Sequence, residues 1–207
     1  MPAVSDKYKK EKKALILKNA FECFAEKGFQ AATIDDIVTR SGISKGAIYN
    51  YFNSKDEIYI ELMNQQTEEN MERLKTNISS LSCSKEKLDY LFETYSNLNN
   101  LPQFQNSTRV HIEFWIYSSR KEDLSELMMS RYQMYTGLFK GIVEEGILNG
   151  EFPSDANAEE LALVFWGFID GASIHFLMLG NEHYPYQNVF KTIKKLIYSN
   201  LAIKKTP

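Results

Sequence analysis

Apolar residues recur three and four positions apart along most of this chain, which is the spacing of one face of an α-helix. The first such stripe comprises Leu17, Ala20, Phe21 and Phe24, and it stops before Gly28, a residue type that commonly ends helices. No stretch alternates apolar and polar residues between hairpin turns, so we expect no β-sheet. The pattern therefore predicts an all-α protein.

Short helices are predicted directly after this first one. Thr33 and Asp36 have the spacing of a capping box, which begins a helix. Gly42 interrupts the pattern, and Ser44 and Ser54 can each cap the helix that follows. The residues expected to face inward are Ile34, Ile37, Val38, Ile43, Ile48, Phe52, Ile58 and Leu62.

Five further helices are predicted beyond residue 80, near 85–99, 104–119, 122–149, 157–180 and 186–203. Turn-forming Asn, Gly and Pro residues separate them. The chain then has about nine helices and divides into a unit of residues 1–55 and a larger unit of residues 56–207. We expect the helix after Ser54 to join the two units without a flexible linker.

Composition places the chain among soluble globular proteins, with 43 % hydrophobic and 25 % charged residues. Cys23 and Cys83 lie far apart and form no CxxC pair, so we expect neither a structural zinc site nor a disulfide framework. Leu161–Leu179 is almost long and apolar enough to span a membrane. However, Asp170 lies at its centre, and a charge there favours a buried helix of a soluble protein. The N-terminus has no apolar signal segment, so we expect a cytoplasmic location and no membrane contact.

The net charge of −3 does not by itself suggest a nucleic-acid partner. Residues 1–60 carry ten Lys or Arg against eight Asp or Glu, so the basic excess lies at the N-terminal end. Lysines 7, 9, 10, 12 and 13 account for most of it. Such a run is either a solvated end or a tail that neutralises phosphates.

The region from Thr33 to Lys55 meets the demands of a helix-turn-helix. The second helix of that motif lies in the major groove, so the turn before it must be tight and its start must be small. Gly42 suits the turn, and Gly46 and Ala47 suit the close approach. Phosphate contacts need hydroxyls and cations. These are available at Thr33, Ser44, Lys45, Tyr49, Tyr51 and Lys55.

This segment resembles the DNA-binding domain of the TetR/AcrR family of bacterial transcriptional regulators. The resemblance covers about 45 to 50 residues, and beyond it only the all-helical length and pattern match. The resemblance rests on five short motifs at fixed spacing: Gly28-Phe29, Thr33 with Ile37, Gly42-Ile-Ser-Lys-Gly46, Ile48-Tyr-Asn-Tyr-Phe52 and Ser54-Lys-Asp56.

The resemblance implies that Ser44–Phe52 is the recognition helix. The residues then nearest base edges are Lys45, Gly46, Ala47 and Asn50, and asparagine is suited to adenine N6 and N7. Phosphates would be held by Thr33, Ser44, Tyr49, Tyr51 and Lys55. Two alternatives stay open, because Tyr49 could belong partly to the core and Lys55 could be a solvated surface charge.

The resemblance also implies a homodimer on a palindromic double-stranded operator, with a small molecule bound in the larger helical domain. Ligand binding would then change the spacing of the two recognition helices. The helix near 157–180 is apolar around most of its circumference, and Gly167 and Gly171 would allow close helix approach. We expect this helix and the helix near 186–203 to form the dimer interface. The alternative is that both belong to the core of a monomer.

The effector site is expected among aromatic residues of the middle helices. The candidates are His111, Trp115, Phe139, Trp166 and Asp170. An aromatic stripe at helical spacing is the other reading, since it also suits a core. Asp170 in an apolar helix needs a partner, a cation or an interface role. The sequence names no effector, and we expect no cofactor and no metal.

Two other classes of protein fit less well. An enzyme is not expected, because the chain has only three histidines and lacks the HExxH, P-loop and GxGxxG motifs. A pure interaction module leaves the polar groove-facing residues of Ser44–Tyr51 unexplained. The resemblance therefore points to a ligand-responsive repressor, with activation as the alternative.

Overall fold

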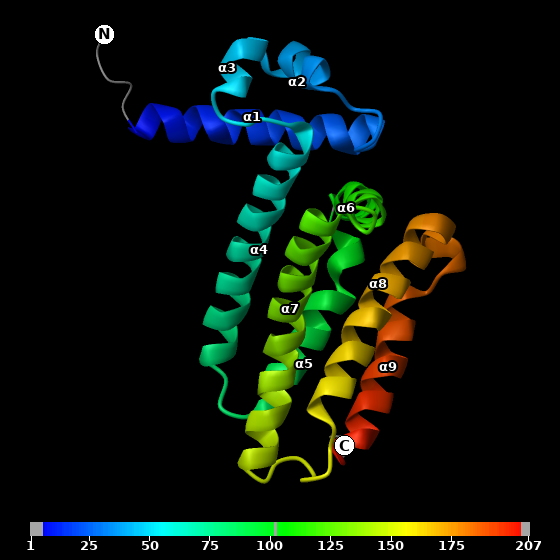
Figure 1. Cartoon of the computed structure of the whole chain (residues 1–207). Helices are drawn as coiled ribbons and strands as arrows, with labels where there is room; N and C mark the ends of the chain where they lie inside the picture. The colour runs from blue at the N-terminus through cyan, green and yellow to red at the C-terminus, as the bar shows by residue number, and fades with distance from the viewer. Residues whose placement is uncertain (1–5, 102, 204–207) are drawn as a thin grey trace. The chain divides into compact units, whose positions relative to one another are not determined.

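The computed structural model describes residues 6–101 and 103–203. Within these ranges the chain forms nine α-helices, one 3₁₀ turn and no β-strand (Figure 1), so the predicted all-α fold is confirmed. The helices are α1 Asp6–Lys27, α2 Ile34–Ser41, α3 Lys45–Tyr49, α4 Lys55–Ser79, α5 Ser84–Ser96, α6 Phe104–Ser118, α7 Glu122–Leu148, α8 Ala158–His183 and α9 Tyr186–Asn200. The 3₁₀ turn is η1 Leu98–Asn100.

The chain packs as two compact units that do not follow one another simply along the sequence. The first comprises Met1–Asn70 with Arg109–Tyr117, and the second comprises Met71–Thr108 with Ser118–Pro207. Helices α4 and α6 each contribute residues to both units. A functional division at residues 1–55 and 56–207 stays a prediction, and its boundary lies where the continuous helix α4 begins.

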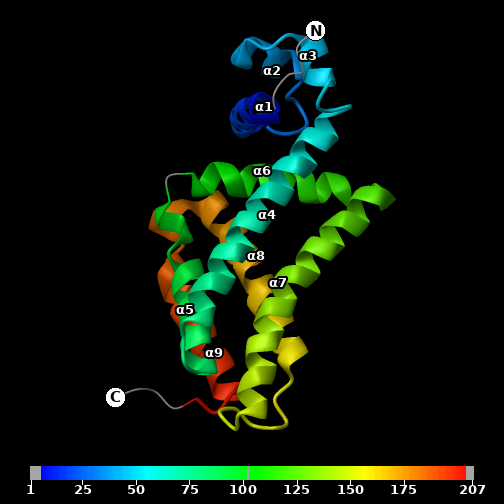
Figure 2. The ribbon, with the colours of Figure 1, turned by 90° about the vertical axis from the view of Figure 1, so that its left-hand side faces the viewer.

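In the first unit, α2 and α3 pack beside α1 (Figures 1 and 2). An aromatic cluster explains why part of α6 belongs there. The Phe114 ring stacks on Tyr59 with centroids 3.9 Å apart and meets the edge of Phe29 at 5.0 Å. Tyr117 adds a ring 5.3 Å from Phe29. Aromatic rings far apart in sequence therefore join the loop after α1 to α4 and α6 in one core.

The N-terminal lysines lie in a helix rather than in a tail. Because α1 already begins at Asp6, the run from Lys7 to Lys13 occupies its first turns. Lysine, glutamate and alanine are good helix formers, and no breaker separates this run from the apolar stripe that follows. The helix ends as predicted at Gly28, whose φ is +81° and whose amide donates to the Phe24 carbonyl at 2.9 Å.

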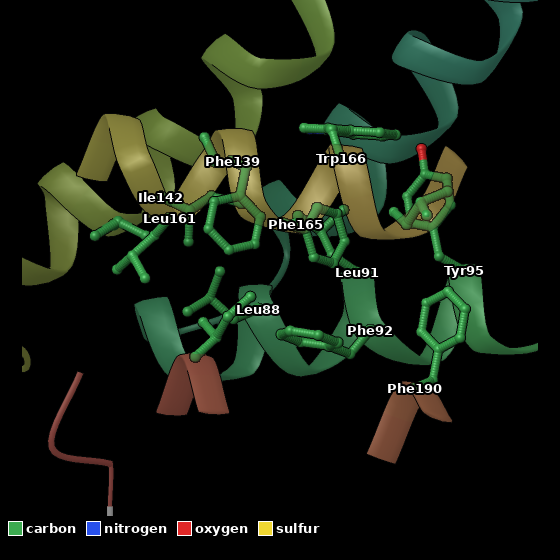
Figure 3. Close-up of a cluster of buried hydrophobic side chains, with 14 of the residues drawn as sticks. Leu88, Leu91, Phe92, Tyr95, Phe139, Ile142, Leu161, Phe165, Trp166 and Phe190 are labelled. Atoms are coloured by element: carbon green, nitrogen blue, oxygen red, sulfur yellow. The ribbon is translucent and has the colours of Figure 1, made fainter. Parts of the chain in front are cut away.

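The second unit is built from α5, α7, α8 and α9 around a buried apolar cluster (Figure 3). Phe165 lies at its centre, stacked on Phe139 at 4.5 Å and meeting Phe92 edge-on at 5.0 Å. The five helices expected beyond residue 80 are all present, and their ends differ from expectation by a few residues. Both cysteines are free thiols, Cys23 buried and Cys83 half-buried.

Helix α8 is long and apolar enough to span a membrane by length and composition, since an 18-residue stretch of it has a mean hydropathy of 1.6. One side of it packs into the core of the second unit through residues such as Phe165, Ile169 and Phe176. Its other side leaves Leu163, Val164 and Met178 exposed at 47 %, 49 % and 74 %. The helix is therefore a core helix with one uncovered apolar face.

Candidate DNA-binding surface and effector site

Helix α2 begins and ends with the local structures that its sequence predicts. Thr33 donates from its amide and its hydroxyl to Asp36 Oδ2 at 2.9 and 2.8 Å, and its Oγ1 accepts from the Asp36 amide at 3.2 Å. At the other end Gly42 adopts a φ of +67°, and its amide donates to the Val38 carbonyl at 3.0 Å. The capping box and the glycine turn are both confirmed. Together they fix where α3 starts.

Helix α3 is shorter than the predicted Ser44–Phe52. Ser44 caps it, accepting from the Ala47 amide at 3.3 Å. The amides of Tyr51 and Phe52 both donate to the Ile48 carbonyl, at 2.9 and 3.1 Å, so the regular helix ends there. Residues after Tyr49 form a tight turn.

The exposed side of α3 carries the predicted base-facing residues. Lys45, Gly46 and Asn50 are exposed, and Ala47 is half-buried. Tyr49 is 46 % exposed, so part of its side chain is available to a ligand. The opposite side is the core that the sequence predicts, since Ile48 and Phe52 are buried at 0 % and 2 % exposure. Packing thus orients the polar residues of α3 outward.

Ion pairs surround this surface. Lys45 Nζ lies 2.9 Å from Asp35 Oδ1, and this hydrogen-bonded contact raises the pKa of Lys45. A hydrogen bond from Lys27, supported by those from Thr33, lowers the pKa of Asp36 to about 2. Both carboxylates lie on α2, so any phosphate approaching Lys45 must compete with Asp35. Exposed pairs of this kind exchange readily, because water screens them.

Lys55 has a role that neither sequence-based reading foresaw. Its ammonium donates to the carbonyls of Phe29, Gln30 and Ala32 at 2.6, 3.0 and 2.8 Å. It is half-buried, and burial lowers the pKa of the Lys55 side chain. An ammonium has three hydrogens, and each has an acceptor here. The side chain therefore closes the loop between α1 and α2, and a phosphate contact would require one of these bonds to open.

Glu113 on α6 holds the same loop from its amide side. Its Oε2 accepts from the Phe29 amide at 2.6 Å. Nearby, the Tyr117 hydroxyl donates to Asp56 Oδ2 at 2.9 Å. No sequence pattern identifies these contacts, because 84 and 61 residues separate the partners. The first unit thus includes polar contacts from α6 that sequence reasoning missed.

The five candidate effector residues fall into the two units. His111 and Trp115 lie in the first, where their rings stack at 6.0 Å as their i,i+4 spacing suggests. In the second, Phe139 is fully buried against Phe165, which is the position of a core residue. Trp166 donates from Nε1 to the Tyr135 carbonyl at 3.0 Å.

Asp170, the fifth candidate, is half-buried one turn after Trp166 on α8. Burial raises the pKa of its carboxyl to about 6, an effect only partly offset by the charge of Arg131. The described residues include no group of three His, Cys, Asp or Glu side chains that could hold a metal ion. The second unit therefore offers an acidic group among aromatic rings.

Two family models match the chain. Residues 16–62 match "Bacterial regulatory proteins, tetR family", and residues 88–187 match "Tetracyclin repressor-like, C-terminal domain". The HTH-type transcriptional regulator QacR of Staphylococcus aureus is 30 % identical over 148 residues, which is 69 % of this chain and 75 % of QacR.

Two solved structures share the fold. One is a putative transcriptional regulator from Saccharomonospora viridis in complex with choline, with a TM-score of 0.81, 22 % identity and coverage of 93 % of this chain and 98 % of the other. The second is the transcriptional regulator FadR from Bacillus subtilis in complex with stearoyl-CoA, with a TM-score of 0.75, 23 % identity and coverage of 93 % and 99 %. With the helix-turn-helix geometry described above, these matches assign the chain to the TetR family of bacterial transcriptional regulators.

Proposed function

We propose that this protein is a cytoplasmic, homodimeric and ligand-responsive repressor that binds a palindromic operator and has no catalytic activity. The observation that carries the proposal is α3, a short helix with its apolar side buried and its polar side exposed directly after a tight turn. In a helix-turn-helix, this is the element that enters the major groove.

Base edges are contacted by Lys45, Gly46, Ala47 and Asn50. Asn50 at the end of α3 supplies the hydrogen-bonding amide that can distinguish adenine. Ser44, Tyr49 and Tyr51 hold phosphates; a serine hydroxyl can donate to a phosphate while its oxygen caps the helix. Thr33 and Lys55 act first by fixing α2 and its preceding loop, and reach phosphates only by releasing part of those contacts.

The dimer forms through α8 and α9. Leu163, Val164, Met178 and Leu196 leave an apolar face on these helices, exposed between 47 % and 74 %. A Cβ atom added at Gly167 would meet nothing within 4 Å, which leaves room for a second copy to approach closely. Exposed apolar patches of this kind mark interaction surfaces.

The effector is a small molecule. Support comes from the two fold relatives, one in complex with choline and the other with stearoyl-CoA. An effector that binds one spacing of the recognition helices better than the other shifts the population away from the DNA-binding state.

The test is selection of bound sequences from a random pool of duplexes. We expect a palindrome whose half-sites lie about 34–36 Å apart, because two copies must read successive major grooves. On that operator, Asn50→Ala should weaken binding by about 1–3 kcal/mol and relax specificity at one position of each half-site. Lys45→Ala should reduce the dependence of affinity on salt. Thr39→Ala, an exposed change on α2, is the matched control. Enrichment of no palindrome, or full specificity in Asn50→Ala, would contradict the proposal.

A further inference from the structure

Asp170 faces α7 at a defined register. Helices α7 and α8 follow one another and run antiparallel within the second unit (Figure 1). The bond from Trp166 Nε1 to the Tyr135 carbonyl fixes their alignment. One turn later on α8 and one turn earlier on α7, Asp170 lies opposite Arg131 and Tyr132, and its charge acts on both.

The negative charge of the Asp170 carboxylate is poorly compensated by its surroundings. It is half-buried, and among the residues that the structure describes none donates a hydrogen bond to it or forms an ion pair with it. Arg131 on α7 attracts it, but the guanidinium carbon of Arg131 lies over the Tyr135 ring, 5.5 Å from its centroid. A half-buried anion without a close partner is unfavourable, and a bound cation would relieve that penalty.

Aromatic rings cluster at Trp166, one turn before Asp170 on α8. The Trp166 ring has Tyr95 of α5 at 4.9 Å (Figure 3). Tyr135 of α7 lies at 4.9 Å from the same ring. Tyr132 lies one turn from Tyr135 and interacts electrostatically with Asp170. Faces of tryptophan and tyrosine attract cations, and they also pack against apolar groups. A carboxylate beside such rings is the chemistry that recognises an organic ammonium group.

We propose that the effector of this protein is a lipophilic organic cation, with its positive charge at Asp170 and its apolar part against Trp166 and the tyrosines of α7. This rests on the proposed function only in placing the effector in the second unit. An anionic group at this position would be repelled by Asp170, and a neutral one would bury the carboxylate further without a partner. A metal ion is disfavoured because one carboxylate supplies too few ligands.

The probes are phenyltrimethylammonium, its neutral carbon isostere tert-butylbenzene and the anion phenylacetate, each titrated into the full-length protein. Binding is followed by the fluorescence of Trp166 in a Trp115→Phe background, which removes the signal of the other tryptophan. We expect the cation to bind about tenfold more tightly than the isostere and the anion most weakly. Asp170→Asn should abolish the difference between the cation and the isostere. Glu182→Gln is the matched control, because Glu182 is an exposed acidic residue near the end of α8. This variant should still bind the cation more tightly than the isostere.

Affinity for the cation should also fall as the pH drops below about 6, since the Asp170 carboxyl then takes up a proton. The charged and ionisable groups that interact with it electrostatically are Arg131 and Tyr132 on α7. Asp170→Asn should show no such fall.

Three results would overturn the inference. These are equal affinity for cation and isostere, no binding of any probe, or an Asp170→Asn variant that changes dimer strength while keeping the preference for the cation. The last would assign Asp170 to a pair with the second copy. Operator binding without probes is measured in parallel, so a failed inference is distinguished from a protein that binds no operator.

Discussion

At the scale of single residues, Lys55 stabilises the DNA-binding unit from within. Replacing it by methionine keeps the apolar stem and removes the donor for three carbonyls of the α1–α2 loop. Partial exposure allows water to replace some of these bonds, so we expect a loss of about 1–2 kcal/mol in the free energy of unfolding. Urea denaturation measures it.

Lys45→Met is the control for this change, since it removes a lysine from an exposed ion pair with Asp35. Its effect on stability should be small, because water screens an ion pair between exposed side chains. Its effect on operator affinity should exceed that on stability. If the two variants unfold at the same urea concentration, Lys55 does not hold the loop.

Two glycines with positive φ allow a second comparison. Gly42→Ala should lower the free energy of unfolding by about 1 kcal/mol, because φ is +67°. No steric contact adds to this loss, since a Cβ there meets nothing within 4 Å. Gly28→Ala adds a contact, since its Cβ would lie 2.9 Å from Glu113 Oε2. That carboxylate would have to leave the Phe29 amide, which costs about 1 kcal/mol more.

A double-mutant cycle separates the two contributions in Gly28→Ala. In a Glu113→Ala background the contact with the carboxylate is already gone. The loss of stability caused by Gly28→Ala should then fall to the loss caused by Gly42→Ala. An unchanged penalty would locate the strain in the backbone alone. Chemical denaturation of the four variants provides the measurement.

Residues such as Gly28 and Lys55 differ in how far sequence could predict them. The helix stops at Gly28 and Gly42 and the caps at Thr33 and Ser44 depend on neighbours within four positions, and all were predicted. Lys55 depends on carbonyls 23 to 26 residues away, so no local spacing reveals it.

At the scale of elements, the capping box makes the start of α2 sensitive to acid. The folded pKa of Asp36, about 2, lies below its ordinary value of 3.8. Its carboxylate therefore stabilises the fold fully above about pH 4, and this contribution is lost as the pH falls through about 2. An NMR titration of the Asp36 carboxyl should have its midpoint near 2. Because Lys27 is the main cause, Lys27→Met should raise that midpoint toward 3.8, and an unchanged midpoint would contradict this assignment.

Element ends were predicted less well than element existence. The predicted recognition helix ran to Phe52, but α3 ends at Tyr49 because two successive amides share the Ile48 carbonyl. Helix α6 was expected within the larger unit, yet residues Arg109–Tyr117 pack with the DNA-binding unit through Phe114. Both differences arise from hydrogen-bond geometry and long-range packing, which the period of apolar residues does not encode.

At the scale of the whole molecule, the proposed palindromic operator needs two copies of α3, so we expect DNA affinity to depend on the proposed dimer. Gly167 lies on the uncovered face of α8, and a side chain added there meets nothing in the same chain. Gly167→Leu should therefore leave the fold intact, and it adds a better helix former. If the face is the dimer interface, the leucine prevents close approach of the second copy.

We expect Gly167→Leu to shift the protein to a monomer at micromolar concentration, by sedimentation or light scattering, and to weaken operator binding at least about tenfold through loss of the second half-site. Gly141→Leu on α7 is the matched control, because a Cβ there also meets nothing within 4 Å. It should remain dimeric and bind the operator like the unmodified protein. A wild-type monomer, or a Gly167→Leu dimer of full strength, would exclude α8 as the interface. If Gly167→Leu instead stays dimeric but loses operator binding, the substitution changes the spacing of the recognition helices without preventing dimerisation.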